Sequence, residues 1–358
     1  MWIAHANNDW ATRHAGALAA LSVLALAIGG TQTAQAAPAA PATLAAPRAR
    51  LRIPGGGPGI GFDDIGYFSV LDRVSIPAGR TGMLDLIDPR NGAIAARYRI
   101  APAAANQAHR AGTTSAAYGD GYIFASDHEH SAVVVLNAHD GKAVSRVPLA
   151  SEPDYVRYLG ARRELWVTEP RGQQIQVFRI RSGAQPRFTL IRTVAVPGGP
   201  ESLVFDSALG RAYTNLWKDK TAVLDLAHPG VIGTWRNGCA GPRGLALDEA
   251  RQFLFVGCAE GAATVLDLRS GGRMLAKATV GAGVDIISYS AALRHLYVPG
   301  ARAATLTVFR VSDSGALQPR ALYRTAPGAH CVTDDGRGRV FVCDPRAGRI
   351  LEFRDQLM

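Results

Sequence analysis

Histidines and acidic residues stand beside short apolar segments, where strands would begin or end. His128 and His130 are two residues apart, so an extended backbone would direct both imidazoles to one side. Imidazoles with a nearby carboxylate such as Glu169 suit zinc, whereas carboxylates and carbonyl oxygens suit calcium. The pattern therefore predicts a divalent ion, Zn²⁺ or Ca²⁺, at His128, His130 and Glu169. The competing interpretation is that these side chains only fill a solvated turn.

The elements that must position these residues repeat along the chain. Tyr213 and Phe255 are 42 residues apart, as are Asp225 and Asp267. Each repeat offers four short segments rich in Val, Ile, Leu and aromatic residues, bounded by Gly, Pro, Asp or Asn. Four strands every 40 to 45 residues or so are typical of a β-propeller blade. The aromatic residues that mark successive second strands are Phe124, Trp166, Tyr213, Phe255, Tyr297 and Phe341.

A more degraded unit precedes these six, with strands expected at 64–69, 73–76 and 83–88. The sequence therefore predicts an all-β fold, a seven-bladed β-propeller with four-stranded antiparallel blades. The last unit offers only three strands, whereas residues 49–53 resemble the outer strands of other units. We expect this N-terminal strand to complete the C-terminal blade and to cover a sheet edge. The propeller would span residues 49–358.

The first 36 residues have the order of a secretory signal peptide. Arg13 precedes an apolar run from Ala15 to Ile28, and the segment ends on Ala34-Gln35-Ala36. A membrane anchor is the alternative, but the run is shorter than the roughly 20 residues of a span. We expect cleavage after Ala36, a disordered Ala/Pro linker over residues 37–48, and a periplasmic or secreted mature chain with no membrane span.

The cysteine count and the charge limit the partners. Four cysteines and no C-x-x-C motif favour disulfides in an oxidising compartment. Cys331 and Cys343 fall opposite each other in adjacent strands, and Cys239 and Cys258 share one edge of another blade, so these two pairs are predicted. The alternative is four buried thiols. The net charge of +10 comes from scattered arginines, which predict a solvated surface and no binding of nucleic acid.

Three second-strand segments share a pattern, and each is followed by a strand like the one that ends in Val223-Leu224-Asp225. They are 212–215 (AYTN), 165–168 (LWVT) and 296–298 (LYV). Over about residues 50 to 356 the chain resembles the YVTN family of bacterial seven-bladed propellers. The resemblance implies the fold and extends to lactonase and NHL-type propellers, but it specifies little about activity.

In a propeller, the loops that enter first strands and the loops that follow second strands open at one mouth of the central channel. Asp63 precedes the first blade at this mouth, and the second-strand ends add His128, His130 and Glu169. The other predicted ligand-binding residues of the mouth are Asp64, His109, Glu152, Asp154, Glu201, Arg243, Asp285 and His330.

Arg243 would either hold an anionic ligand or neutralise Glu201 and Asp285. The aspartates that recur at the ends of first and third strands suit turns rather than catalysis. They are Asp206, Asp225, Asp248 and Asp267.

Three functions remain open. The first is a monomeric binding module for a protein, peptide or small molecule at the mouth. The second, implied by the resemblance, is a metal-dependent lactonase-like hydrolase. The third is the propeller subunit of a periplasmic dehydrogenase, for which the sequence offers no cofactor attachment site. We favour binding, because no complete set of metal ligands can be identified from the sequence.

Overall fold

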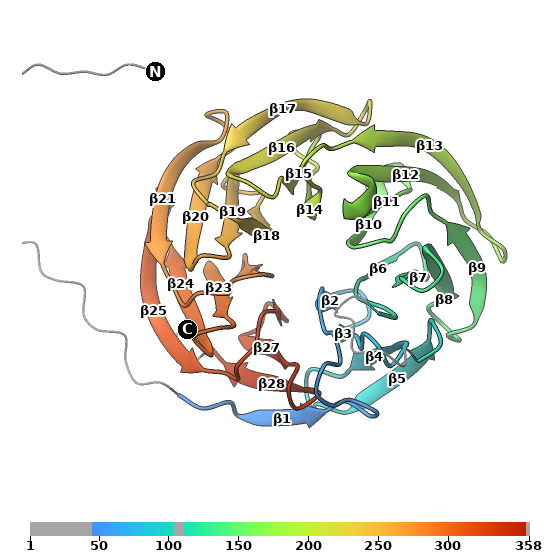
Figure 1. Ribbon diagram of the computed structural model, residues 1–358, viewed down its shortest axis with the longest axis horizontal. Coiled ribbons are helices and arrows are strands. Elements are labelled where there is room, and N and C mark those ends of the chain that lie inside the picture. Colours follow the sequence, from blue (N-terminus) through green and yellow to red (C-terminus); the bar gives the residue numbers. More distant parts are fainter. Residues whose placement is uncertain (1–44, 104–110, 356–358) are drawn as a thin grey trace, which may run out of the picture. The chain divides into compact units, whose positions relative to one another are not determined.

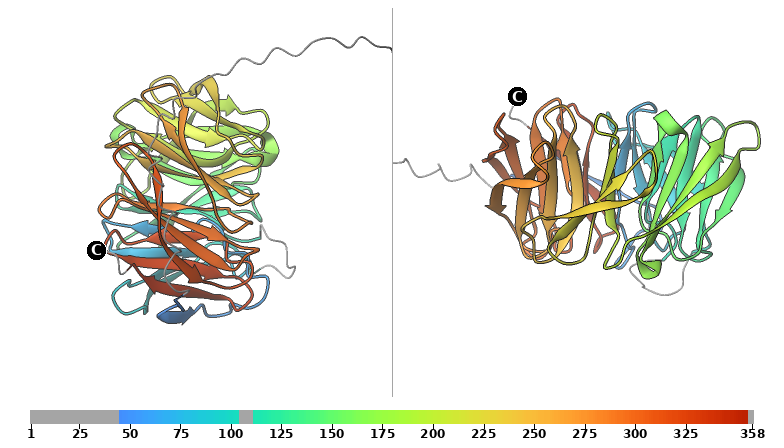
Figure 2. Two further views of the ribbon diagram at one scale, coloured as in Figure 1. Left: turned by 90° about the vertical axis from the view of Figure 1, so that its left-hand side faces the viewer. Right: turned by 90° about the horizontal axis from the view of Figure 1, so that it is seen from above.

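Each repeat folds into one four-stranded antiparallel sheet, and seven such sheets surround a channel (Figure 1). This computed structural model describes residues 45–103 and 111–355. Seen from the side, the strands run from one face of the ring to the other (Figure 2). The predicted signal peptide and most of the predicted linker lie outside the described residues. Among the described residues, no helix is long and apolar enough to cross a membrane.

Blades 1 to 3 follow the chain from the channel outward. Blade 1 contains β2 (Gly66–Phe68), β3 (Arg73–Pro77), β4 (Met83–Ile87) and β5 (Ile94–Arg99). Blade 2 contains β6 (Ala116–Gly119), β7 (Tyr122–Asp127), β8 (Ala132–Asn137) and β9 (Ala143–Pro148). Blade 3 contains β10 (Val156–Leu159), β11 (Glu164–Glu169), β12 (Gln174–Arg181) and β13 (Arg187–Ala195), with single 3-10 turns η1 (Gly160–Arg162) and η2 (Pro170–Gly172).

Blades 4 to 6 repeat the pattern. Blade 4 contains β14 (Glu201–Asp206), β15 (Arg211–Asn215), β16 (Lys220–Asp225) and β17 (Gly230–Arg236). Blade 5 contains β18 (Pro242–Asp248), β19 (Phe253–Cys258), β20 (Ala262–Asp267) and β21 (Arg273–Thr279). Blade 6 contains β22 (Ser288–Ser290), β23 (His295–Gly300), β24 (Thr305–Val311) and β25 (Leu317–Arg324).

Blade 7 takes its strands from both ends of the described chain. Its order is β1 (Ala49–Arg52), β28 (Arg349–Arg354), β27 (Arg339–Asp344) and β26 (Val332–Asp334). β1 pairs antiparallel with β28, with Ala49 opposite Glu352 and Arg52 opposite Arg349. At the following turn a Cβ on Gly56 would lie 2.6 Å from the Gly348 carbonyl oxygen, so the chain can cross there only as glycine.

The hydrophobic core lies between the blades. Seven clusters of buried apolar side chains fill the seven blade-to-blade contacts. The cluster between blades 7 and 1 includes Ile53, Val74 and Phe341, so the segment after β1 also seals the ring. The six second-strand aromatic residues identified from the repeat are all fully buried. Burying these rings fixes each blade against its neighbours, which leaves the channel mouth to polar residues.

The repeated aspartates close turns, as predicted. The carboxylates of Asp206 and Asp248 accept the backbone N–H groups of Leu209 and Arg251, three residues further along the chain. In the turns after third strands, Asp225 accepts the N–H of His228, three residues further, and Asp267 accepts the N–H of Arg269, two residues further. Their side chains therefore stabilise strand connections on the side of the ring away from the predicted mouth.

Both predicted disulfides are confirmed. Cys239 and Cys258 are bonded within blade 5 with their Cα atoms 5.2 Å apart, and Cys331 and Cys343 within blade 7 at 5.5 Å. In blade 7, Val332 pairs with Val342, which places the flanking cysteines directly opposite each other. Each disulfide thus ties the entry of a first strand to the end of the second strand beside it.

Candidate functional site

The inner strands of all seven blades line a cavity of about 390 Å³ in the central channel. Most of its wall is small or apolar, with Gly66, Ala116 and Gly244 among the lining residues. Arg157 is the charged side chain that an inner strand contributes to this lining, and Asp64 lies at its edge. The polarity of the site is therefore concentrated in the loops that lead into the inner strands.

Carboxylates from different blades gather at this entrance. Asp63 precedes blade 1, Asp154 precedes β10, Glu201 begins β14, and Asp285 precedes β22. Asp63, Asp154 and Glu201 are 7%, 4% and 5% exposed, so the cluster is largely withdrawn from solvent. The predicted mouth residues Asp64, Asp154, Glu201 and Asp285 all act electrostatically on Asp63.

Asp63 is the central carboxylate of this cluster. Burial, and then the charges of Asp154, Asp285, Asp64 and Glu201, raise its pKa well above the usual value. Among residues 45–103 and 111–355, no donor forms a hydrogen bond with its carboxylate. Buried carboxylates are ordinarily paired or hydrogen-bonded. Asp63 is thus a buried acidic group that lacks a protein partner within the described part of the chain.

Tyr155 lies within the same cluster and is 2% exposed. Burial raises the pKa of its hydroxyl well above the usual range, and the charges of Asp63, Asp285, Glu201 and Asp154 raise it further. The guanidinium carbon of Arg157 lies 5.0 Å from the centre of the Tyr155 ring. The tyrosine therefore stays protonated and presents an aromatic wall beside the carboxylates.

Two arginines neutralise part of the acidic charge. Arg157 binds both oxygens of Asp64, at 2.5 and 2.9 Å, and Ser115 donates a further hydrogen bond of 2.6 Å to Asp64. Arg243 reaches Glu201 at 3.3 Å, which agrees with the neutralising role rather than with a bound anion. Asp154 and Glu201 also have interactions beyond these. Of the five carboxylates in the cluster around Asp63, Asp64 and Glu201 are thus paired with the guanidinium groups of Arg157 and Arg243.

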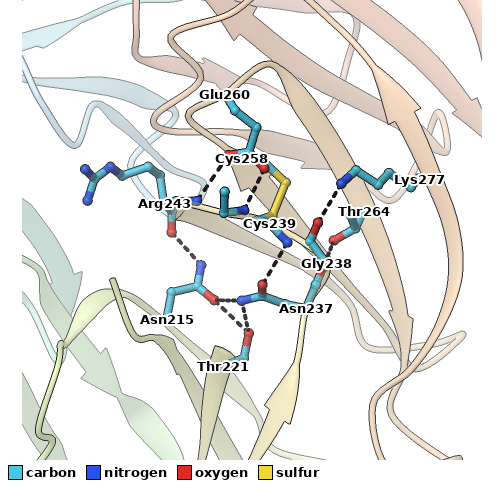
Figure 3. Close-up of a disulfide and its surroundings, with 12 residues drawn as sticks. Asn215, Thr221, Asn237, Gly238, Cys239, Arg243, Cys258, Glu260, Thr264 and Lys277 are labelled. Atoms are coloured by element: carbon cyan, nitrogen blue, oxygen red, sulfur yellow. Dashed lines mark hydrogen bonds between the residues drawn. A yellow bond between two sulfur atoms is a disulfide. The ribbon is translucent and has the colours of Figure 1, made fainter. Parts of the chain in front are cut away.

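Hydrogen bonds beside the Cys239–Cys258 disulfide hold the backbone of Arg243 at the mouth. The Asn215 side chain donates to the Arg243 carbonyl at 2.6 Å, and Asn237 and Thr221 in turn hydrogen-bond Asn215. The Cys239 backbone N–H donates to Asn237 at 3.1 Å. Figure 3 shows the guanidinium of Arg243 pointing away from the disulfide. The buried amide network therefore holds the backbone, while the charged end extends toward Glu201.

Two of the other predicted mouth residues, Glu152 and His330, lie within the described part of the chain. Glu152 pairs with Arg171 at 2.9 Å on the surface. His330 is held between the carbonyls of Gly328 and Phe62, at 2.7 and 2.8 Å, and lines a second cavity of about 400 Å³ together with Asp285 of the carboxylate cluster. His109 lies outside the described residues.

The structure does not bring His128, His130 and Glu169 together as one set of metal ligands. β7 ends at Asp127, so His128 and His130 lie in a turn and the alternation of an extended strand does not apply. The His128 ring bonds Thr114 at 2.8 Å, whereas His130 turns back to Asp127 at 2.9 Å. Glu169 accepts a hydrogen bond from Gln174 at 2.8 Å.

Within the described ranges, two groups of three side chains have potential ligand atoms within 4.8 Å of one another. Each group includes both sulfurs of a disulfide, with His330 in one and Glu260 in the other. Disulfide sulfurs are not thiolates and do not serve as ordinary metal ligands. Neither of these two groups therefore offers a set of ligands that would fit a divalent ion.

Sequence reasoning missed Tyr155, Arg157 and Ser115. The signal was present in the segment Asp154-Tyr155-Val156-Arg157, which places an arginine three residues after a predicted mouth carboxylate. Its partner could not be read from the sequence. Arg157 and Asp64 are separated by 93 residues and meet only because the ring places blades 1 and 3 around one channel.

Seven four-stranded antiparallel sheets around a channel with a charged mouth define this chain as a seven-bladed β-propeller. No family model matches the chain, so its YVTN resemblance remains a prediction, and no curated protein matches it in sequence.

Solved structures share the fold. A chain of hydrazine synthase from Kuenenia stuttgartiensis is 12% identical with a TM-score of 0.68, over 84% of this chain and 97% of that one. A chain of the mitotic checkpoint complex is 12% identical with a TM-score of 0.71, over 93% and 98%. The β-propeller domain of Cps50 (Swd1) from Myceliophteria thermophila is 12% identical with a TM-score of 0.66, over 86% and 98%. Such low identity shows the fold alone.

Proposed function

We propose that this chain is an exported, monomeric binding module whose channel mouth takes up a positively charged group of a protein, peptide or small molecule. The observation that carries the proposal is Asp63, buried among Asp154, Glu201 and Asp285 without a hydrogen-bond partner in the described residues. A cationic group between these carboxylates would relieve their mutual repulsion. It would also supply the hydrogen bonds that Asp63 lacks.

The surroundings of the cluster support a ligand of this kind. Asp63, Asp154 and Glu201 are largely buried, so a cation beside them interacts more strongly than it would at a fully exposed surface. Tyr155 adds an aromatic face, to which ammonium and guanidinium groups are attracted. The cavity of about 390 Å³ below the cluster gives room for the stem of such a ligand.

Export is supported by the leader-like first 36 residues and by the two disulfides, which persist in oxidising compartments. A protein partner is supported by the similar propellers found within larger assemblies, such as the mitotic checkpoint complex. The hydrolase and dehydrogenase-subunit alternatives are not favoured by any observation in the described residues.

Titration of the full chain with spermine, followed by calorimetry, tests the proposal. Because the protein carries a net charge of +10, a polyamine has no general electrostatic reason to bind it. We expect one saturable site, and at least a tenfold loss of affinity when Asp63→Asn and Asp285→Asn are combined. The matched control combines Asp140→Asn and Asp313→Asn, which lie in turns between third and outer strands and form surface ion pairs away from the mouth.

Affinity of the control variant should stay within about twofold of the original. Absence of saturable binding, or equal losses in both variants, would contradict the proposal. A parallel titration with calcium chloride separates an organic cation from a metal. Calcium binding without spermine binding would show that the mouth is a metal site instead.

A further inference from the structure

The outer strands of the seven blades carry charge of one sign. They are β1, β5, β9, β13, β17, β21 and β25, and all of them lie within the described residues. Each contains at least one arginine, and none contains an aspartate or glutamate. The circumference of the ring is therefore basic, in contrast to the acidic channel mouth.

Three of these outer strands are neighbours and form what we call the arginine face. β25, β1 and β5 follow one another around the ring (Figure 1). Ala45, just before β1, bridges to Tyr323 of β25, and Arg97 of β5 donates to the carbonyl of Pro54, just after β1. The face consists of the exposed side chains of Arg320 and Arg324 on β25, Arg50 and Arg52 on β1, and Arg97 and Arg99 on β5.

On β1 and β5 the two arginines are two residues apart in regular strand, so both members of each pair point to the same side of the sheet. Two residues of extended strand span about 7 Å. That distance is shorter than the Debye length of about 8 Å at physiological ionic strength, so the paired guanidinium charges on β1 and β5 repel each other. A bound anionic group would therefore reduce the repulsion between these guanidinium groups.

A carboxylate offsets this repulsion at one of the six arginines. Of the six arginines, Arg97 alone has a carboxylate partner among the described residues, Asp85 at 3.0 Å. On the other side of the ring two outer-strand arginines are paired with aspartates, whereas Arg187 and Arg192 of β13 have no carboxylate partner among the described residues. Arg236 of β17 bonds Asp219 at 3.0 Å, and Arg273 of β21 lies 3.6 Å from Asp267.

A hollow at one end of the face is lined by three arginines. Arg97 and Arg99 of β5 and Arg80 line a cavity of about 260 Å³, beside Gly55 at the turn after β1. Arg80 is fixed there by the carbonyls of Gly59 and Pro58, at 3.0 and 3.2 Å. Planar guanidinium groups match the oxygens of phosphate and sulfate in paired hydrogen bonds.

We propose that the arginine face binds a flexible anionic polysaccharide that carries phosphate or sulfate groups, with one such group in the hollow at Arg80, Arg97 and Arg99. The outer strands follow the curve of the ring (Figure 1), so a flexible chain can reach all three, whereas a flat membrane meets fewer of them. Nucleic acid fits less well. Single-strand binders add exposed aromatic rings for base stacking, and the tyrosines of these strands, Tyr98 and Tyr323, are not exposed.

Fluorescence anisotropy with a labelled heparin oligosaccharide tests this binding on the full chain. One variant combines Arg50→Gln, Arg52→Gln, Arg320→Gln and Arg324→Gln. The control removes the same charge from other outer strands, by Arg187→Gln, Arg192→Gln, Arg236→Gln and Arg273→Gln. We expect at least a tenfold loss of heparin affinity in the first variant and less than threefold in the control. The slope of log affinity against log salt should fall by about one for each arginine that contacts an anionic group.

Unchanged thermal unfolding confirms that the first variant is folded. Unchanged spermine binding shows that its loss of heparin affinity is independent of the channel mouth. Equal losses in the two variants would overturn the proposal, because the attraction would then reflect net charge alone. Stronger binding to oligo(dT) than to heparin would assign the face to nucleic acid. Stronger binding to phosphatidylglycerol vesicles would assign it to a membrane, and failure of all three probes to bind would leave the face without this role.

Discussion

Two buried glutamates at the two ends of β11 have different surroundings. Glu164 accepts hydrogen bonds from Arg162, Trp166 and Arg179, at 3.1, 3.1 and 2.8 Å. Glu169 has Gln174 as its hydrogen-bonding side chain, and one of its oxygens has no partner. Burial raises the pKa of Glu169 to about 7. The strand therefore holds one glutamate with three side-chain donors and one with a single side-chain donor and an unpaired oxygen.

Replacing Glu169 by Gln should stabilise the fold at neutral pH. Because the folded pKa is raised, the unfolded chain loses its proton first, and stability falls as pH rises from about 4.5 to about 7. Glu169→Gln removes that loss, worth about 2 to 3 kcal/mol above pH 7, and changes little below pH 4.5. Urea unfolding across this pH range measures the difference in the free energy of unfolding between the variant and the original protein. The matched variant Glu164→Gln should instead lose about 1 to 3 kcal/mol at neutral pH. Destabilisation by both variants would contradict the assignment.

At the residue scale, the sequence located the carboxylates but not their partners. The repeat fixes where each blade begins, so Asp154, Glu201 and Asp285 could be assigned to one mouth. The pairing of Glu152 with Arg171 depends on side-chain direction, which a repeat does not specify. The histidine prediction depended on whether residues 128–130 continue the strand, and they form a turn.

At the scale of single elements, the four-residue strand β1 closes the ring. Without it, β28 would present an open edge, and the apolar cluster that contains Ile53 would be exposed. Deleting residues 45–53 should abolish cooperative thermal unfolding or cause aggregation, as followed by circular dichroism and light scattering. Changing Arg50 and Arg52 to Gln keeps the backbone pairing and serves as the control. Unaltered unfolding of the deletion variant would show that the closing strand is dispensable.

The elements themselves could be predicted to within a few residues because the repeat has a strong period. The last three strands, expected at 331–335, 339–343 and 350–354, are Val332–Asp334, Arg339–Asp344 and Arg349–Arg354. The first strand of blade 1 is shorter than the expected 64–69. Asp64 instead makes a bridge to Ser115 in blade 2 and an ion pair with Arg157. Contacts between blades determine where such a short inner strand begins.

At the scale of the whole molecule, charge is separated between the channel and the circumference. Carboxylates from several blades meet at the mouth because all first strands converge on the channel. The arginines of the outer strands are spread along the largest circumference and have few acidic neighbours. A protein with a net charge of +10 thus contains a local acidic site, which its composition alone could not predict.

The most direct test of the binding site is the titration of the Asp63 carboxyl group by carbon-13 NMR, with and without saturating spermine. A bound cation favours the ionised carboxylate, so the raised pKa of Asp63 should fall by at least one pH unit when spermine is present. By linkage, spermine affinity should then decrease as pH falls through the pKa of the unbound protein. The charges that set this pKa are those of Asp64, Asp154, Glu201 and Asp285. An Asp63 pKa that is the same with and without spermine would contradict the assignment of the channel mouth as the cation-binding site.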